Sequence, residues 1–452
     1  MSRILFLAAS ALLCLGPASG LRAQTLEEAL VAAYLTNPRL EAERANVRAT
    51  DELVPQARAG FRPTLSLNSN AGITWQDTDF GTDTFTPFTN SLSLNQPLYR
   101  GGETTASVRR AEAVVRADRA ALGAAEQQLL LDAAAAYTDV LAAQAVLDLA
   151  NNNVQRLRRQ LEATQDRFEV GEVTRTDVAQ AEARVSQAIS DQVQAAGALL
   201  ATKATFRRVI GLEPQSLVRP TPLAGLPASE EEARRVAAEI NPNIIAARFN
   251  ATAARADVDV ALSALRPRLS LNGELTNANE PTATIDNQTS ASLGASLTVP
   301  LYQGGAESAR VRQTKQILRQ RLDQLDETGR AVFEEVTAAA QQLETATAQI
   351  RSITDQVRAA EIALEGARQE ALVGARTTLD VLDLEQDLFQ AQVSLVQAAR
   401  DEIVASYRLK AAIGQLTVTE LDLPVEPYEA EAHYRDVRGK WFGLGQPTRT
   451  IE

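Results

Sequence analysis

The chain has 452 residues, 45% of them hydrophobic and 23% charged, so its apolar content is sufficient for a large core. Its 45 Lys and Arg residues against 57 Asp and Glu residues give a net charge of −12, which argues against a nucleic-acid partner because phosphate-binding surfaces need a basic excess. Cys14 and His433 are the single residues of their types, so we expect no disulfide, no metal site, no cofactor and no enzymatic activity.

The N-terminus has the pattern of a secretory signal peptide. Arg3 precedes an apolar run over 4–15, and small residues follow, so residues 1–23 are predicted to be removed on export. Leu13 stands before Cys14, where a lipoprotein signal has a small residue, and acylation is therefore not expected. No later segment approaches 18 consecutive apolar residues, so no transmembrane helix is predicted.

The rest of the chain is a tandem duplication. The motif Pro-Leu-Tyr-x-Gly-Gly at 97–102 recurs at 300–305, and Asn-Pro, Arg-Pro, Val-Gly and Ile-Gly pairs recur in the same order at nearly the same offset. We expect a first structural repeat over 24–225 and a second over 226–423. Residues 424–452 show no periodicity and are predicted to be a disordered tail.

In each repeat, an opening helix ends at an Arg-Pro pair and the apolar period then changes to two. Leu65 and Leu67 alternate with Ser and Asn, and the same pattern recurs in the second repeat at Leu269 and Leu271. This predicts four strands of about ten to thirteen residues, in pairs flanking polar linkers at 77–83 and 277–287. Half-buried hairpins of a soluble sandwich and the tilted strands of an outer-membrane barrel fit this pattern equally well.

Long helices follow the strands. Residues 103–169 and 307–373 contain no proline and are rich in strong helix formers, so each is predicted to form a helix on the order of 100 Å long. Gly171 and Gly374 follow these stretches, where a left-handed helix cap is needed. A shorter helix then returns, so each repeat should contain one helical hairpin.

Four strands cannot close into a barrel, because about eight is the practical minimum. An open sheet edge that faces lipid would leave backbone groups without partners. If these strands enter a membrane, the protein must therefore oligomerise, as a dimer with eight strands or a trimer with twelve.

Over the chain to about residue 423, the sequence resembles the TolC family of outer-membrane channel proteins. The resemblance is carried by the duplicated Arg-Pro, Pro-Leu-Tyr-x-Gly-Gly and Val-Gly-x(5)-Asp-Val blocks, the last at 170–178 and 373–381. It implies an α+β membrane fold in the outer membrane of a Gram-negative bacterium. The strands of a homotrimer would complete a 12-stranded β-barrel in the lipid, which continues into a long α-helical barrel, or tunnel, in the periplasm.

The resemblance also implies a function. The protein would be the trimeric exit duct of a tripartite efflux or type I secretion system, passively conducting substrates from an inner-membrane pump of RND or ABC type and a periplasmic membrane-fusion adaptor protein. Drugs, metal ions and polypeptides are all compatible with this function as cargo. The alternative is a periplasmic coiled-coil scaffold or adaptor without a pore, which explains the long hairpins but neither the alternating strands nor the duplication.

Two sets of functional residues follow from the resemblance. The adaptor-docking tips correspond to Val170, Gly171, Glu172, Val373, Gly374 and Ala375. The periplasmic gate and constriction correspond to Asp177, Arg376, Asp380 and Asp383.

For two of these four residues, a structural role in capping a helix is the alternative to a role in the gate. Asp177 and Asp380 each lie three residues after a threonine, and an acidic residue in the first turn of a helix stabilises the free backbone donors there. In a trimer, three copies each of Asp380 and Asp383 would also form rings of like charge, which favour cations.

The other two gate residues differ between the repeats. Gln180 and Val173 occupy the positions equivalent to Asp383 and Arg376, as expected of a gate built in only one repeat. Ala371 stands where the best-known member of the family has a gating tyrosine, so the entrance would be held either less tightly or by other contacts.

Overall fold

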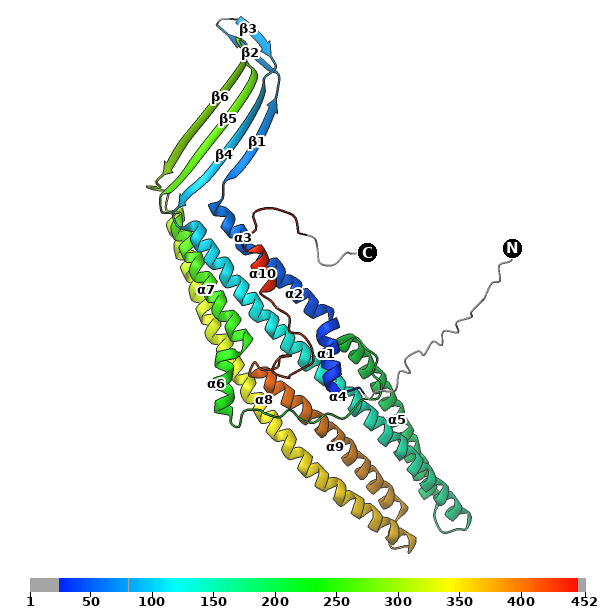
Figure 1. Ribbon diagram of the computed structural model, residues 1–452. Helices are drawn as coiled ribbons and strands as arrows, with labels where there is room; N and C mark the ends of the chain where they lie inside the picture. The colour runs from blue at the N-terminus through cyan, green and yellow to red at the C-terminus, as the bar shows by residue number, and fades with distance from the viewer. Residues whose placement is uncertain (1–23, 80, 446–452) are drawn as a thin grey trace, which may run out of the picture. The chain divides into compact units, whose positions relative to one another are not determined.

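A computed structural model describes residues 24–79 and 81–445 (Figure 1). The predicted signal peptide at 1–23 lies outside the described residues. The chain divides into two compact units, and each unit takes segments from both sequence repeats, so units and repeats do not coincide. The hairpin unit comprises residues up to Leu35, Asp132–Pro222 and Ala346–Val404, and the strand unit comprises Thr36–Leu131, Leu223–Thr345 and residues from Ala405.

The helices follow the predicted plan in each repeat. The two long helices, α4 (Glu103–Glu169) and α8 (Ala306–Leu372), have 67 residues each, as predicted, although α8 starts one residue earlier. Their return helices are α5 (Arg175–Ile210) and α9 (Thr378–Ala412). The shorter helices are α1 (Leu26–Thr36), α2 (Pro38–Asp51), α3 (Leu53–Arg58), the 3-10 turn η1 (Ala59–Phe61), α6 (Glu230–Ile240) and α7 (Pro242–Ser263).

Helix α4 contains one window of 18 residues that is apolar enough to cross a membrane by length and composition alone. Because 44% of that window is buried inside the chain, the same pattern suits an ordinary core helix.

The strand unit contains a four-stranded antiparallel sheet in the order β1-β4-β5-β6. Its strands are β1 (Thr64–Ala71), β4 (Phe88–Arg100), β5 (Arg268–Thr282) and β6 (Ile285–Thr298). The central pair, β4 and β5, joins the two repeats, while β1 and β6 form the edges. The four predicted strands are therefore confirmed, and each repeat supplies two of them. Their lengths of 8, 13, 15 and 14 residues differ from the predicted ten to thirteen, because β1 ends at Ala71 and β5 and β6 extend toward their shared turn.

The two polar linkers are shorter than predicted. Residues 74–78 and 81–85 form a separate hairpin of strands β2 (Thr74–Thr78) and β3 (Gly81–Phe85), and β5 and β6 continue almost to their shared turn. Thr82 donates to Asp77 across the β2–β3 pair at 2.7 Å. Threonine favours strands, and such cross-strand bonds extend pairing into a stretch that polarity alone marks as a loop.

The register places the apolar side chains on one face of the sheet. Leu67 pairs with Leu92, which pairs with Leu275, and directly paired residues share a face. Asn95 and Asn272 lie on the other face, where their side chains are hydrogen-bonded at 2.6 Å. Leu67 is 68% exposed, so this apolar face is not covered by the described part of the chain.

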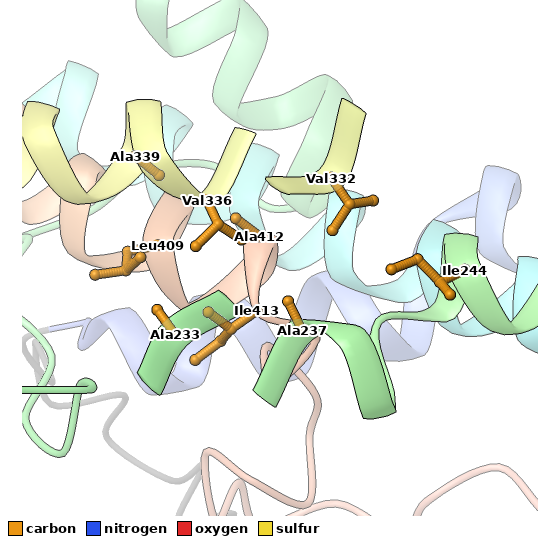
Figure 2. Packing of buried hydrophobic residues seen from close by; sticks show 9 residues of the cluster. All are labelled: Ala233, Ala237, Ile244, Val332, Val336, Ala339, Leu409, Ala412 and Ile413. Atoms are coloured by element: carbon orange, nitrogen blue, oxygen red, sulfur yellow. The ribbon is translucent and has the colours of Figure 1, made fainter. Parts of the chain in front are cut away.

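The core of the strand unit is built from small and branched side chains (Figure 2). Ala233 and Ala237 of α6 belong to the same buried cluster as Val336 of α8, and their small size allows the helix backbones to approach closely. The remaining members of this cluster are Ile244, Val332, Ala339, Leu409, Ala412 and Ile413. Asn241 fixes the α6–α7 junction because its side chain donates to the Ala412 carbonyl at 2.9 Å while capping α7.

The glycine turn after β4 offers a stability test within the duplicated motif. Gly101 has φ +65°, and a Cβ there would lie 2.6 Å from the Ser263 carbonyl oxygen. Its equivalent, Gly304, has φ +62° and no neighbour within 4 Å. Gly304→Ala should cost about 1–2 kcal/mol for the left-handed conformation alone. Gly101→Ala should cost about 1–3 kcal/mol more, because the backbone at Ser263 must move to make room for the added Cβ.

Thermal unfolding followed by circular dichroism measures this difference. A lower midpoint for Gly101→Ala than for Gly304→Ala is expected, and equal midpoints would contradict the close approach at Gly101.

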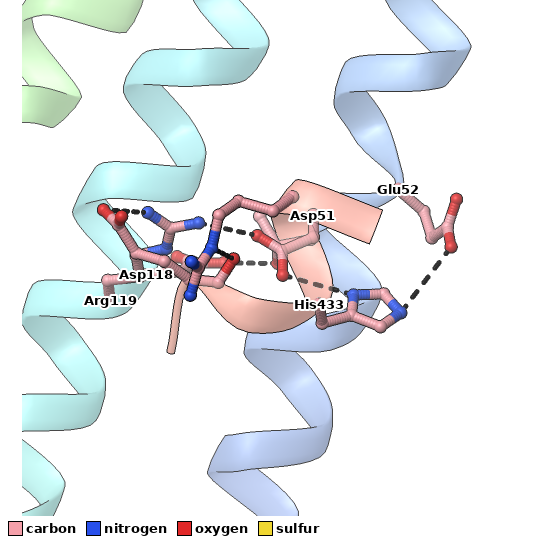
Figure 3. Close-up of polar contacts among 8 residues, drawn as sticks. Asp51, Glu52, Asp118, Arg119 and His433 are labelled. Carbon is pink, nitrogen blue, oxygen red and sulfur yellow. Dashed lines mark hydrogen bonds and ion pairs between the residues drawn. The ribbon is translucent and has the colours of Figure 1, made fainter. Parts of the chain in front are cut away.

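The C-terminal segment is ordered over residues 424–445, so the predicted disorder is wrong there; residues 446–452 lie outside the described part. This segment contains helix α10 (Ala432–Val437), and Arg62 donates to the Lys440 carbonyl at 2.8 Å. His433 contacts the buried Asp51 at 3.2 Å (Figure 3). These contacts join residues nearly 400 positions apart, which is why periodicity does not reveal them.

Candidate functional site at the hairpin tips

Both hairpins of the hairpin unit turn through the same backbone motif. After α4, the amide of Glu172 donates to the Arg167 carbonyl at 2.9 Å and the amide of Gly171 to the Phe168 carbonyl at 3.0 Å. After α8, Ala375 and Gly374 donate to the carbonyls of the corresponding residues. Gly171 and Gly374 have φ +79° and +74°. These are Schellman caps, which confirms the predicted left-handed glycines.

The turns expose apolar side chains. Val170 is 72% exposed and Val373 is 80% exposed, and Leu372 beside it is 77% exposed. The tip glycines have no other group within 4 Å of an added Cβ. The predicted docking residues thus lie at two uncovered turns, each of which presents a valine before its glycine.

Asp177 and Asp380 form capping boxes in α5 and α9. The backbone amide of Thr174 donates to Asp177 at 2.8 Å, and that of Thr377 donates to Asp380 at 3.1 Å. Hydrogen bonds from the threonine hydroxyls and amides lower the pKa of both carboxyl groups. Their contribution to the caps is therefore complete above the ordinary aspartate pKa and is lost only as the pH falls through the lowered value.

The two predicted gate residues that differ between the repeats have different ion-pair partners. Asp383 on α9 forms an ion pair with Arg184 on α5, which links the two hairpins. Arg376 instead pairs with Glu370 at 2.8 Å, within its own turn. Asp383 thus links two helices of the chain, whereas Arg376 pairs only within its own turn.

A buried charge cluster beside Asp383 was missed by sequence reasoning. Glu385 on α9 has a side chain that is only 4% exposed, and it contacts Arg156 of α4 at 3.3 Å and Arg368 of α8. We call these three residues the Glu385 cluster. The positions equivalent to the two arginines hold Ala359 and Gln165, so a comparison of charges between the repeats could have found it.

Apolar packing positions the cluster. Leu382, 1% exposed on α9, packs against Val154 and Leu157 of α4 and against Ala181 of α5. Val381, the preceding residue of α9, packs in a second cluster with Leu364 and Ala367 of α8. Helix α9 is therefore held among α4, α5 and α8, with Asp383 and Glu385 placed to form ion pairs.

A sheet with an uncovered apolar face and a pair of capped helical hairpins are the parts of an outer-membrane channel protein. The chain belongs to the outer membrane efflux protein family, whose model matches residues 29–212 and 234–415. It is 38% identical over 427 residues to the outer membrane efflux protein BepC of Brucella suis biovar 1, covering 94% of this chain and 92% of that protein.

Two further comparisons agree with this membership. The outer membrane protein TolC of Vibrio cholerae is 29% identical over 408 residues, covering 88% of this chain and 92% of the relative. The crystal structure of the Campylobacter jejuni CmeC outer membrane channel superposes with a TM-score of 0.79 at 15% identity, covering 92% of this chain and 89% of that one, which shows the fold. The resemblance to the TolC family is confirmed, and the protein is an outer-membrane channel of the efflux and secretion type.

Proposed function

We propose that the protein works as a homotrimer whose four-stranded sheets close into one 12-stranded barrel. The sheet itself supports this proposal most strongly. Its edge strands, β1 and β6, each have a single neighbour in the described part of the chain, and its apolar face is uncovered. In lipid, such edges need partners, and identical copies can supply them by pairing β6 of one chain with β1 of the next. Twelve strands leave room for an open lumen.

The helical hairpins then form the periplasmic end of the duct. Val170, Gly171 and Glu172, with Val373, Gly374 and Ala375, dock onto an adaptor protein that connects the channel to an inner-membrane pump of RND or ABC type. Their exposed apolar turns suit a contact surface. The channel catalyses nothing. The name of the relative at 38% identity favours efflux over secretion as its task.

Asp177, Arg376, Asp380 and Asp383 are the proposed gate and constriction. The caps keep Asp177 and Asp380 ionised, so charge persists at the entrance in mild acid. Arg184 places a positive charge beside each Asp383 and weakens the field of that ring. Cation preference therefore depends on the balance between these two residues.

Arg184→Gln should raise the preference of the channel for cations, and Asp383→Asn should lower it. The reversal potential in a salt gradient across a planar bilayer measures both. Arg208→Gln, at the far end of α5, is the control and should leave the potential unchanged. If Asp380→Asn with Asp383→Asn kept the wild-type preference, the aspartate rings would not set selectivity.

Cell fractionation and planar-bilayer recording test the exit-duct function. The account predicts an outer-membrane protein that gives stable single-channel steps when purified and reconstituted. A protein that stayed in the soluble periplasmic fraction and gave no conductance would instead be the scaffold considered above.

A further inference from the structure

The C-terminal segment ends in an exposed apolar patch. Trp441 is 63% exposed, Phe442 is 88% exposed and Leu444 is fully exposed. We call residues 440–444, which begin with Lys440, the C-terminal patch. Large apolar side chains that gather on a surface mark a site of contact with a protein or with lipid.

Two arginines hold the C-terminal patch by its backbone. Arg62 donates to the Lys440 carbonyl at 2.8 Å, and its guanidinium lies 4.7 Å from the centre of the Trp441 ring. Arg58 of α3 donates to the Arg438 carbonyl at 3.1 Å. Because these bonds use main-chain oxygens, they fix the position of the patch and leave its apolar side chains exposed.

The contact between Arg62 and the patch is not part of the duplicated plan. Arg266 is the equivalent residue of the second repeat, and it donates instead to the Gly101 carbonyl at 3.2 Å. The same Arg-Pro position thus supports a turn in one repeat and the C-terminal patch in the other.

The patch is held beside the end of the sheet that joins the helices. Arg62 comes two residues before β1 begins, and Leu65 of the apolar face follows three residues after Arg62, about 10 Å along an extended chain. Phe61 is 55% exposed, and its carbonyl accepts a hydrogen bond from Gln96 of β4 at 3.1 Å. In an outer-membrane channel the apolar face of the sheet contacts lipid, so the patch lies near the boundary between hydrocarbon and headgroups.

The polar side chains around the patch are mainly basic. They are Arg58, Arg62, Arg438 and Lys440, and none of them forms an ion pair within the described part of the chain. Glu52 lines the hollow between α3 and the patch, and its carboxylate lies 3.8 Å from His433. In a chain with a net charge of −12, a group of cations beside an exposed apolar patch suits an anionic partner.

We propose that the C-terminal patch anchors the channel to anionic phospholipids in the leaflet on the helical side of the outer membrane. Trp441, Phe442 and Leu444 enter the boundary between headgroups and acyl chains, a depth that tryptophan favours. Arg438 and Lys440 bind the lipid phosphates. The anchor lies outside the barrel strands, and it determines how the channel is seated in lipid rather than what the channel conducts.

Fluorescence quenching of Trp441 tests the anchor. The chain contains two tryptophans, and the other one, Trp75, lies in β2. Trp75→Phe therefore leaves Trp441 as the single reporter in the full-length channel. The channel is reconstituted in vesicles of phosphatidylethanolamine and phosphatidylglycerol whose acyl chains carry bromine close to the headgroups.

The anchor predicts that brominated lipid quenches Trp441 and that iodide in the water does not. Quenching by iodide but not by bromine would show that the patch lies in water, and would overturn the proposal. Protection from both quenchers would show that a neighbouring copy of the chain covers the patch, which overturns it equally.

A charge variant tests the contact with headgroups. One basic side chain near an anionic surface favours binding about fivefold. Lys440→Gln should therefore raise the fraction of phosphatidylglycerol that gives half of the maximal bromine quenching. Arg435→Gln, in the same segment, is the matched control, because Arg435 already pairs with Glu429. Equal effects of the two variants would contradict a specific role of Lys440 in lipid binding.

An apolar variant tests the second half of the anchor. Phe442→Ser with Leu444→Ser should weaken the bromine quenching of Trp441, because less apolar surface enters the lipid. Unchanged quenching would show that these two side chains stay outside the membrane. The exit-duct proposal is tested separately by conductance, which a channel without this anchor retains.

Discussion

Replacing Leu67 with arginine should prevent the protein from accumulating as a folded oligomer in the outer membrane. Leu67 lies in the row of paired leucines on the apolar face of the sheet and is 68% exposed. In the proposed barrel that face contacts lipid, where an arginine at the midplane costs about 2–4 kcal/mol. A trimer contains the substitution three times, so the penalty multiplies.

Asn68→Arg is the matched control for this experiment. Asn68 is the next residue of β1, and it pairs with Ser91 on the opposite, polar face. Its variant should reach the outer membrane as a trimer that survives mild detergent. Equal accumulation of the Leu67→Arg and Asn68→Arg variants in membrane fractions would mean that the leucine face does not contact lipid.

Removal of the Asp51 carboxylate should cause a large loss of stability in the strand unit. Asp51 is fully buried, and it accepts hydrogen bonds from Arg119 at 3.3 Å and contacts His433 at 3.2 Å (Figure 3). Asp51→Ala leaves Arg119, which is 16% exposed, with Glu431 as its remaining ion-pair partner. Breaking a buried pair on one side costs about 3–5 kcal/mol, and the lower end is expected here because Glu431 stays.

Glu52→Ala controls for the loss of an acidic residue near His433. Glu52 is 46% exposed and lies 3.8 Å from the imidazole, so its removal should cost less than about 1 kcal/mol. Denaturant unfolding in detergent compares the free energies of unfolding of the Asp51→Ala and Glu52→Ala variants. Faster proteolysis within residues 424–445 is also expected for Asp51→Ala. Equal stability of both variants would contradict a structural role for the buried carboxylate.

The elements that could be predicted from the sequence are those fixed by local chemistry. The absence of proline marks the 67-residue helices, and a glycine after a helical run marks the left-handed caps at Gly171 and Gly374. The period of two marks the strands, because successive side chains of a strand point to opposite faces of the sheet. One face is apolar and the other is polar. Because the sequence is duplicated, the helix, cap and strand predictions are each made once per repeat and can be compared between the repeats.

Features that depend on partners distant in the chain could not be predicted in this way. The order of residues 424–445 comes from arginines of α2 and α3, from Arg62 directly after η1 and from Asp51, none of which carries a local sign of that contact. Glu385 and Glu182 are identical residues at equivalent positions, yet only Glu385 is buried. Its burial is decided by α4 and α8, which supply the arginines.

The mass of the detergent-solubilised protein tests the central claim most directly. Within residues 24–79 and 81–445, the four-stranded sheet has two unpaired edges and an uncovered apolar face, and in lipid identical chains would have to complete it. Native mass spectrometry of material extracted from the outer membrane should therefore give three times the mass of one chain. A stable, water-soluble monomer would contradict the barrel, and with it the lumen and the aspartate rings.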